Sequence, residues 1–501
     1  MNKSCSKLND VPDTPPPAMG SRAAQARLRT LFDTHYSAQA LRQQLGTEIA
    51  DGGGTNIHEL VARTDDRSPC SLLVRLFLAG FEVASGDLVA ALGAQDTALL
   101  TDLGLIVARG AGFGPCARID PHETCWIASD VRARHGMRAA DFVLGPSPVS
   151  QLLAKLTIRR PVASTLDLGC GAGQLAMLAA EHSGTVVATD VNPRAVSFAQ
   201  FNLALNECAS VEVRTGSLFE PVGDARFDLI VCNPPFVISP DTTYIYRDGM
   251  SDICRRIVTE APAHLTADGC LQMLCNWPQW VGEPWSAAVA DWVRDIGCDV
   301  WLLRIHNLSA AMYSAVWLTQ EFGSEGAIPS EAYQRWAGHL KNQNIDSVGS
   351  GLLIVRPVTG RLPWCEYRDA PPLLGAAGEC IDHTLRCRDY LARLENKDRL
   401  LDEVLVPASA LELRTRAGLG SGQWNTLGRQ LSQTCGLGFT LNLDPVAASI
   451  VAMLDGKRTL RELVQAFAAE HGVAPEYFLP QLPAAITELI HRGMLEPALS
   501  A

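Results

Sequence analysis

The chain contains 501 residues, a length that predicts three or four domains. Hydrophobic residues make up 47% and charged residues 19%, an ordinary globular balance that is enough to build large packed cores. The formal net charge of −12 disfavours a protein that holds long nucleic acid on a broad basic face, although a local basic patch can exist within an acidic total.

Other compositional features place the chain among reduced, non-membrane proteins. The 15 cysteines are an odd number without a C-x-x-C pair, which predicts packed thiols in a cytoplasmic protein. Residues 1–22 contain PPPA at 15–18 and predict a disordered tail, because they lack the apolar centre of a signal peptide. The sequence contains no run of 18 apolar residues, so no membrane-spanning helix is predicted. The histidines show no metal-ligand spacing, so no metal site is predicted.

The first predicted domain covers residues 23–135 and is mainly helical. Three short helices are predicted at 71–80, 85–93 and 96–106, followed by a hairpin within 106–130. This order resembles a winged helix, a unit that often binds DNA. Because the segment is not basic, packing on the next domain or gating of substrate is the favoured role.

Residues 136–362 change to alternating strands and helices, which predicts a mainly parallel sheet covered by helices. The expected arrangement is a Rossmann-like α/β domain of seven strands with the chemistry at their C-terminal ends. Residues 309–347 are expected to be a helical insertion. The predicted strands lie at 165–170, 185–191, 211–218, 227–236, 270–278, 299–307 and 351–360.

The remaining chain predicts a linker and a second small domain. Residues 363–435 form a linker or helical region, with a charged helix at 381–405 and a loop at 418–424. Residues 436–501 predict a short strand and three helices, which is a winged-helix-like domain. Thr459 and Glu462 precede an apolar periodic run and predict a capping box.

A glycine-rich turn follows the first strand of the α/β domain. Gly169, Gly171 and Gly173 allow a tight turn and a close ligand. By itself this pattern also fits a plain strand-to-helix turn. Asp190 ends the next strand, where a carboxylate can bind both ribose hydroxyls of an adenosine or cap the following helix. The G-x-G-x-G form differs from the G-x-G-x-x-G of dinucleotide sites, and Asp167 precedes the first glycine by two residues.

The fourth predicted strand ends in Asn233-Pro234-Pro235-Phe236. The nitrogen of a planar amide or amine is a poor nucleophile, because its lone pair is delocalised. The side-chain carbonyl of Asn233 and the backbone carbonyl of Pro234 can each accept one N–H bond, which lets that lone pair localise. The prolines fix the backbone, and Phe236 offers a flat face for stacking. Catalysis then rests on positioning and electrostatic preorganisation.

These motifs resemble those of class I S-adenosylmethionine-dependent methyltransferases. Residues 140–280 resemble the family that methylates glutamine amides of release factors, and its small-domain relatives that act on rRNA guanine. Phe236 stands where that family usually has Tyr, and Ser217 stands where an acidic residue is common. The resemblance implies S-adenosyl-L-methionine as cofactor. The cofactor-binding residues that it implies are Asp167, Gly169, Cys170, Gly171, Gly173, Asp190, Val191, Asn192, Ser217, Leu218 and Asn233.

Two further segments are candidates for the methyl acceptor. Tyr246, Arg247 and Asp248 follow the NPPF motif closely and can line an acceptor site or form a surface loop. Asn276 and Trp277 follow the fifth strand and can roof the acceptor pocket or belong to the core.

The C-terminal block is similar to a small peptide-chaperone winged helix of modified-peptide biosynthesis. That similarity implies binding of a peptide or protein, and a structural or dimer-forming winged helix is the alternative.

The sequence therefore leads to three hypotheses. The first is an N-methyltransferase for an amide or amine of a protein, peptide or small molecule. The second is an amine methyltransferase for bases of rRNA or tRNA, which needs a basic groove. The third is a non-catalytic winged-helix regulator that senses the cofactor.

Overall fold

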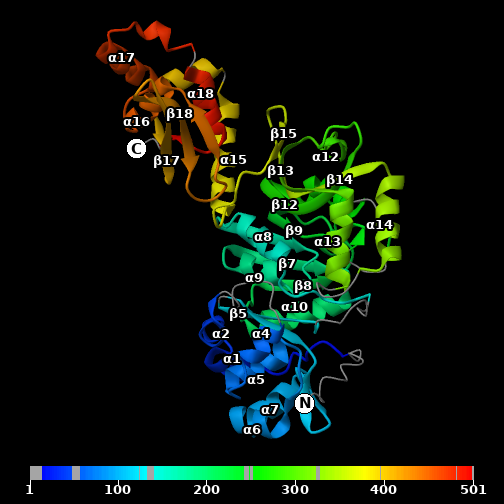
Figure 1. Cartoon of the computed structure of the whole chain (residues 1–501). Helices are drawn as coiled ribbons and strands as arrows, with labels where there is room; N and C mark the ends of the chain where they lie inside the picture. The colour runs from blue at the N-terminus through cyan, green and yellow to red at the C-terminus, as the bar shows by residue number, and fades with distance from the viewer. Residues whose placement is uncertain are drawn as a thin grey trace. The chain divides into compact units, whose positions relative to one another are not determined.

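The computed structural model describes residues 14–47, 57–122, 124–131, 140–241, 247–248, 252–322, 328–394, 396–480 and 482–498. It divides into two compact units (Figure 1). Unit 1 comprises Met1–Ala154 and Pro161–Arg368, and unit 2 comprises Lys155–Arg160 and Asp369–Ala501. Among the described residues, no helix combines the length and the apolar character that crossing a membrane requires.

A large mixed sheet forms the centre of unit 1, and the prediction of a Rossmann-like α/β domain is confirmed. In the described part of the chain the sheet has eight strands in the order β15-β13-β14-β12-β9-β6-β7-β8. The strands are β6 (Val162–Leu168), β7 (Ser183–Asp190), β8 (Val211–Thr215), β9 (Phe227–Cys232), β12 (Leu265–Trp280), β13 (Cys298–Ser309), β14 (Ile345–Pro357) and β15 (Cys365–Asp369).

The prediction of seven strands is therefore wrong, because it left out the edge strand β15. Strands buried on both faces appear in a sequence as continuous apolar runs. Strand β15 reads CEYRD, is partly exposed along its length and pairs only with β13 among the described strands. A short polar edge strand carries no apolar run, so it falls within the segment predicted as linker.

The order of the sheet explains where its functional edge lies. Strands β12, β9, β6, β7 and β8 are parallel to their neighbours, whereas β14 runs antiparallel to both β12 and β13. The chain continues from β6 to β7 on one side and later returns to β9 on the other. Ligands bind at such a reversal, beside the carboxyl ends of the strands.

Helices follow the individual strands of the sheet. Helix α9 (Gln174–Ala180) follows β6, and α10 (Pro193–Leu205) follows β7. Asn192 caps α10 by accepting the amide of Arg194 at 2.9 Å, with Pro193 in the first turn. Helices α11 (Asp252–Glu260) and α12 (Ala287–Trp292) follow β9 and β12.

The segment between β13 and β14 contains α13 (Ala310–Phe322) and α14 (Ser330–Asn342), which lie side by side (Figure 1). Their shared core contains the buried rings of Tyr313 and Trp336, together with Val237 and Ile238 from the short strand β10 (Val237–Ile238). The insertion is thus packed directly behind the NPPF segment.

The N-terminal elements are joined to the sheet by one continuous core. They are α1 (Arg22–His35), α2 (Ala38–Leu45), α4 (Ile57–Ala62), α5 (Pro69–Phe77), β1 (Val83–Ala84), α6 (Ser85–Leu92), α7 (Ala94–Asp102), β2 (Ile106–Arg109), β3 (Gly112–Pro115), β4 (Arg118–His122) and β5 (Cys125–Ser129). The segment predicted as one hairpin forms two, β2–β3 and β4–β5.

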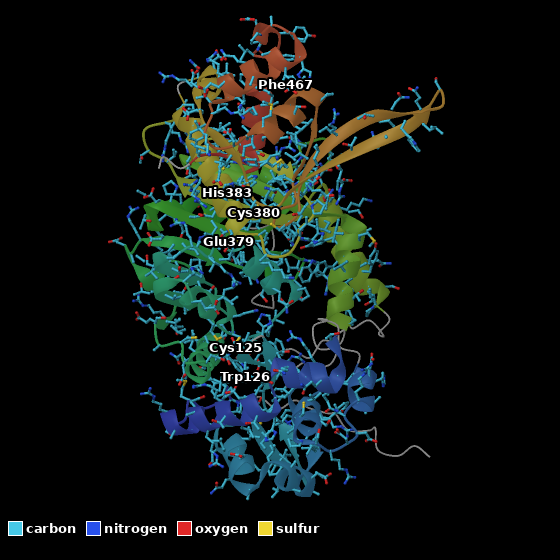
Figure 2. All side chains as sticks on the ribbon, turned by 90° about the vertical axis from the view of Figure 1, so that its left-hand side faces the viewer. Cys125, Trp126, Glu379, Cys380, His383 and Phe467 are labelled. Atoms are coloured by element: carbon cyan, nitrogen blue, oxygen red, sulfur yellow. The ribbon has the colours of Figure 1, made fainter. Side chains whose placement is uncertain are left out.

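Asn202 of α10 and Asn206, the residue that follows this helix, explain why the predicted domains 23–135 and 136–362 belong to one unit. Asn202 exchanges hydrogen bonds of 2.8 and 2.9 Å with the backbone of Ala128. Asn206 does the same with Trp126, at 3.0 and 2.8 Å. Trp126, labelled in Figure 2, packs in a core that also includes Phe198. Helix α10 therefore serves the N-terminal elements and the sheet together.

Unit 2 is built from helices and small antiparallel sheets. Its elements are α15 (Gly378–Arg393), β16 (Leu405–Pro407), β17 (Leu411–Gly420), β18 (Gln423–Gln433), β19 (Thr440–Leu443), α16 (Pro445–Met453), α17 (Leu460–His471), α18 (Leu482–His491) and β20 (Leu495–Pro497). Figure 2 marks Cys380 and His383 on α15. The predicted capping box is confirmed, because Thr459 and Glu462 bond reciprocally at the start of α17.

The predicted linker of 363–435 and its boundary at 435 do not match this structure. Strands β17 and β18 form a long hairpin, and β18 also pairs with β19, so one sheet spans the boundary. The turn consists of Ser421 and Gly422, with φ of 52° and 78°. Two residues with positive φ form the kind of turn that suits the twist of a hairpin. The predicted loop of 418–424 is thus mostly strand.

Candidate active site

A cavity of about 690 Å³ lies at the carboxyl ends of the central strands of unit 1. The turns after β6, β7, β8 and β9 all contribute to its wall. The structure thereby brings together most of the residues that the sequence predicted. The predicted residues that line it are Gly169, Cys170, Gly171, Asp190, Val191, Asn192, Ser217, Leu218, Asn233, Pro234, Pro235 and Phe236.

The glycines after β6 have two different roles. Gly169 and Gly171 have φ of 76° and 52°, a region that L side chains rarely adopt. A Cβ on either residue would meet no atom, so both present bare backbone to the cavity. Gly173 has φ of 84°, but a Cβ there would lie 3.3 Å from Ala199. Gly173 does not line the cavity, and its position lets α9 start close against α10.

Asp190 is held in a defined orientation at the end of β7. One carboxylate oxygen accepts the amide of Gly171 at 2.8 Å, and the other accepts the amide of Asn192 at 2.8 Å. Burial raises the pKa of Asp190, and these backbone donors oppose the increase. Each oxygen keeps a free lone pair. Asp190 is thus placed to accept hydroxyl donors from a ligand in the cavity.

Asp167 lies behind the glycine turn, in the fully buried part of β6. Its carboxylate has no exposed surface, and neither oxygen makes a hydrogen bond of full geometry within the described residues, although the backbone amide of Ala176 lies near enough to affect its pKa. Burial raises the pKa of Asp167 to about 7, the amide of Ala176 opposes this increase, and the charge of Asp190 adds to it. A buried carboxylate without a partner is costly when ionised. Its charged form therefore favours the approach of a cation.

The NPPF segment leaves one acceptor atom free. The side-chain oxygen of Asn233 is buried and has no hydrogen-bond partner in the described part of the structure. The preceding Cys232 is fixed, because its thiol lies 3.1 Å from the carbonyl of Leu168 as a donor. Burial raises the thiol pKa of Cys232 and of Cys170 well above the ordinary value. Both thiols stay protonated and are poor nucleophiles, whereas the side-chain oxygen of Asn233 is available as a hydrogen-bond acceptor.

The insertion supplies two residues that the sequence did not identify. Trp317 of α13 lines the cavity together with Phe236. Tyr313, one turn earlier, is buried, and its hydroxyl accepts the amide of Ile238 at 3.0 Å and the side chain of Asn276 at 3.0 Å. Tyr313 therefore fixes the backbone just after the NPPF motif, and Trp317 extends the aromatic wall.

The segment before α8 (Pro148–Leu156) also lines the cavity, from Phe142 to Ser150. Its turn is held locally, because Ser147 and Ser150 bond each other's amide or hydroxyl groups at 2.9–3.4 Å. The sequence offered one signal for this segment, the Gly145-Pro146-Ser147-Pro148 run before the glycine motif. Its apolar residues give no chemical signature of a site.

Two of the acceptor candidates are corrected by the structure. Trp277 is fully buried in the core beneath the sheet, and its indole N–H donates to the carbonyl of Trp285 at 2.9 Å. Asn276 is buried and supports Tyr313. Neither residue lines the cavity. Strand β12 is much longer than predicted and continues through both residues, so its side chains enter the core on both faces.

The other acceptor candidates lie partly outside the described residues, which is the case for Tyr246. Arg247 and Asp248 form β11 (Arg247–Asp248), whose backbone pairs with β10 directly after the NPPF motif. Within the described ranges, no group of three or more His, Cys, Asp or Glu residues is arranged to hold a metal ion.

Comparison with known families assigns this part of the chain. Residues 146–282 match the family model described as methyltransferase small domain, and they include the glycine turn, Asp190 and the NPPF segment. The fold and the site of this segment therefore resemble those of the methyltransferases, as the motifs predicted. Residues 33–116 and 382–497 match two further models, each described as a domain of unknown function.

Individual relatives point to the same class. The chain is 35% identical over 156 residues to a release factor glutamine methyltransferase of Geobacter sulfurreducens, covering 26% of this chain and 55% of the relative. It is 40% identical over 129 residues to a ribosomal protein uL3 glutamine methyltransferase of Bradyrhizobium diazoefficiens, covering 22% and 40%. It is 34% identical over 125 residues to a ribosomal RNA small subunit methyltransferase C of Alcanivorax borkumensis, covering 24% and 36%. The chain thus spans about half, or less, of the length of these relatives.

Proposed function

We propose that the chain is an S-adenosylmethionine-dependent N-methyltransferase that methylates a planar amide nitrogen of a protein or peptide. The observation that carries the proposal is the buried, unpartnered side-chain oxygen of Asn233 in the wall of the cavity. Relatives named as glutamine methyltransferases support the amide as acceptor.

The residues of the cavity fit the proposed cofactor. Gly169 and Gly171 leave bare backbone on which a flat or extended ligand can lie. Asp190 would accept the ribose hydroxyls. Backbone amides already hold both of its carboxylate oxygens in a fixed orientation. Asp167 does not line the cavity, but its buried carboxylate lies directly behind the glycine turn and would balance the positive charge of the methionine part through space. When bound, the cofactor supplies a methyl group already activated on a sulfonium.

The chain's own groups orient the acceptor. The side-chain carbonyl of Asn233 would accept one N–H of the acceptor nitrogen, and the backbone carbonyl of Pro234 would accept the other. Two such bonds hold the nitrogen and favour localisation of its lone pair. Phe236 and Trp317 provide aromatic surface for the planar acceptor group. No strong base is required, because the proton leaves after the nitrogen has become positively charged.

The proposal is tested by calorimetric titration of the purified chain with S-adenosylmethionine, and separately with NAD. We expect micromolar binding of S-adenosylmethionine alone. Asn233→Ala should retain this binding but lose about 10²–10³ in turnover, the usual cost of one positioned catalytic hydrogen bond. Glutamine-containing peptides of ribosomal proteins and release factors are the first acceptors to assay. Binding of NAD, or full activity of Asn233→Ala, contradicts the proposal.

A second candidate function is methylation of a base amine in rRNA. The observation that favours it is the relative named ribosomal RNA small subunit methyltransferase C, which is 34% identical to this chain over 125 residues. The same Asn233 and Pro234 carbonyls would hold an exocyclic amine. Transfer of radiolabelled methyl to purified ribosomal subunits, followed by separation of protein and RNA, distinguishes the two acceptors.

A further inference from the structure

We propose that the β17–β18 hairpin of unit 2 is a docking arm for single-stranded RNA. The hairpin extends beyond the helices of unit 2 as a two-stranded ribbon (Figure 2). This inference does not rest on the proposed methyl transfer, since it concerns binding at a separate surface.

The tip of the hairpin exposes large apolar side chains. Trp424 is 73% exposed, and Leu419, its cross-strand partner, is 68% exposed. Leu427, which is 61% exposed, lies at the irregularity where β18 has one extra residue. A stable protein rarely leaves a tryptophan and two leucines together in water without a partner. The tip is therefore a contact surface.

The charge of the hairpin identifies the partner. From Leu413 to Leu443 the sequence contains no Asp or Glu, although the whole chain has 54 of them in 501 residues. The same stretch contains Arg414, Arg416 and Arg429. Arg414 pairs with Glu412 at the base of the hairpin, at 2.9 Å. Arg416 and Arg429 have no ion-pair partner among the described residues, so a strongly acidic protein presents cations here without local compensation.

An exposed aromatic ring and arginines without ion-pair partners on one hairpin fit RNA better than an apolar partner. Arginines neutralise phosphates, and an exposed indole stacks on an unpaired base. The bases of RNA loops are accessible for such stacking, and RNA-binding modules use aromatic rings on strands in this way. The side-chain amides of Gln423 and Asn425 flank Trp424 and can bond base edges. The net negative charge of the whole chain would repel RNA phosphates elsewhere and so limit RNA contact to this hairpin.

The test is fluorescence anisotropy of a labelled 20-nucleotide mixed-sequence RNA with the full chain, between 50 and 200 mM salt. We expect measurable binding at low salt and a loss of about tenfold in Trp424→Ala, in the range of one lost stacking contact. Replacing Arg416 and Arg429 with Gln should reduce the slope of log affinity against log salt by about 1.4. All these positions are at least partly exposed, so the variants should keep the parent's melting temperature.

Two matched variants serve as controls. Tyr477→Ala removes another aromatic side chain of unit 2, one that is 70% exposed. Arg386→Gln removes an arginine on α15 whose side chain is 68% exposed. Both should bind RNA like the parent.

Three results overturn the proposal. The first is absence of RNA binding at 50 mM salt, and the second is equal loss in the hairpin and control variants. The third is a different partner for the tip, shown when Trp424→Ala abolishes binding to anionic vesicles or dissociates a dimer while RNA affinity stays unchanged.

Discussion

Replacement of Asp167 with Asn should stabilise the protein without cofactor, and the gain should depend on pH. Asp167 is fully buried, and its oxygens have no hydrogen-bond partner in the described part of the chain. Asn has nearly the same shape and remains neutral. The substitution therefore removes a buried charge and little else.

The magnitude follows from the raised pKa. The pKa of Asp167 is about 7 in the folded protein, against an ordinary value of 3.8. The folded protein holds this proton more tightly than the unfolded chain, so stability decreases as the pH rises from about 4 to about 7. At about 1.4 kcal/mol per pKa unit, the ionised carboxylate costs about 4 kcal/mol above pH 7 and about 1 kcal/mol at pH 4.5.

Urea unfolding followed by circular dichroism at pH 4.5 and pH 8.0 measures this difference. The advantage of Asp167→Asn over the parent should grow by about 3 kcal/mol between the two pH values. The control is Asp224→Asn at an exposed position, which should give the same small difference at both. An advantage of Asp167→Asn that is independent of pH would refute the idea of a costly buried charge. The variant should also bind S-adenosylmethionine more weakly, because the negative charge behind the glycine turn is lost.

Other substitutions test the remaining walls of the cavity. Asp190→Ala should weaken binding of S-adenosylmethionine by about 10- to 100-fold through loss of charged hydrogen bonds, and an unchanged dissociation constant in calorimetry argues against the ribose role. Tyr313→Phe removes the hydroxyl that accepts the amide of Ile238 and a side-chain N–H of Asn276, so urea unfolding should show a loss of about 2–4 kcal/mol, with lower turnover at unchanged cofactor affinity. Wild-type stability in that variant would show that the hydroxyl is dispensable. Trp317→Ala should raise the KM for the acceptor about 3- to 10-fold, the worth of an aromatic contact, and a steady-state assay with unchanged KM removes Trp317 from the acceptor site.

The sequence by itself determined the chemistry of the central motifs, because their geometry is local. Glycine favours tight turns and close approach of a ligand, so the three alternate glycines predicted a ligand-binding turn, and the positive φ of Gly169 and Gly171 agrees with this. The prolines after Asn233 fix the backbone of the motif, whatever surrounds it. Alternation of apolar strands and helices predicted the sheet, and parallel strands place their carboxyl ends at one edge. The cofactor side of the site therefore followed from residues close together in the chain.

Tertiary structure alone decided which distant residues complete the site. Trp317 reaches the cavity only because the α13–α14 insertion packs behind β10, and the sequence contains no local signal of that contact. Trp277 lies near the end of the predicted strand 270–278, yet β12 continues to Trp280 and buries it.

The same holds for the outer parts of the fold. The short edge strand β15 and the β17–β18 hairpin have mixed polarity, so their strand character depends on the neighbours they pair with. Strand β15 pairs with the distant strand β13, which costs chain entropy that only the assembled fold offsets. Sequence patterns record what a residue does to its own backbone, whereas these contacts depend on where the rest of the chain lies.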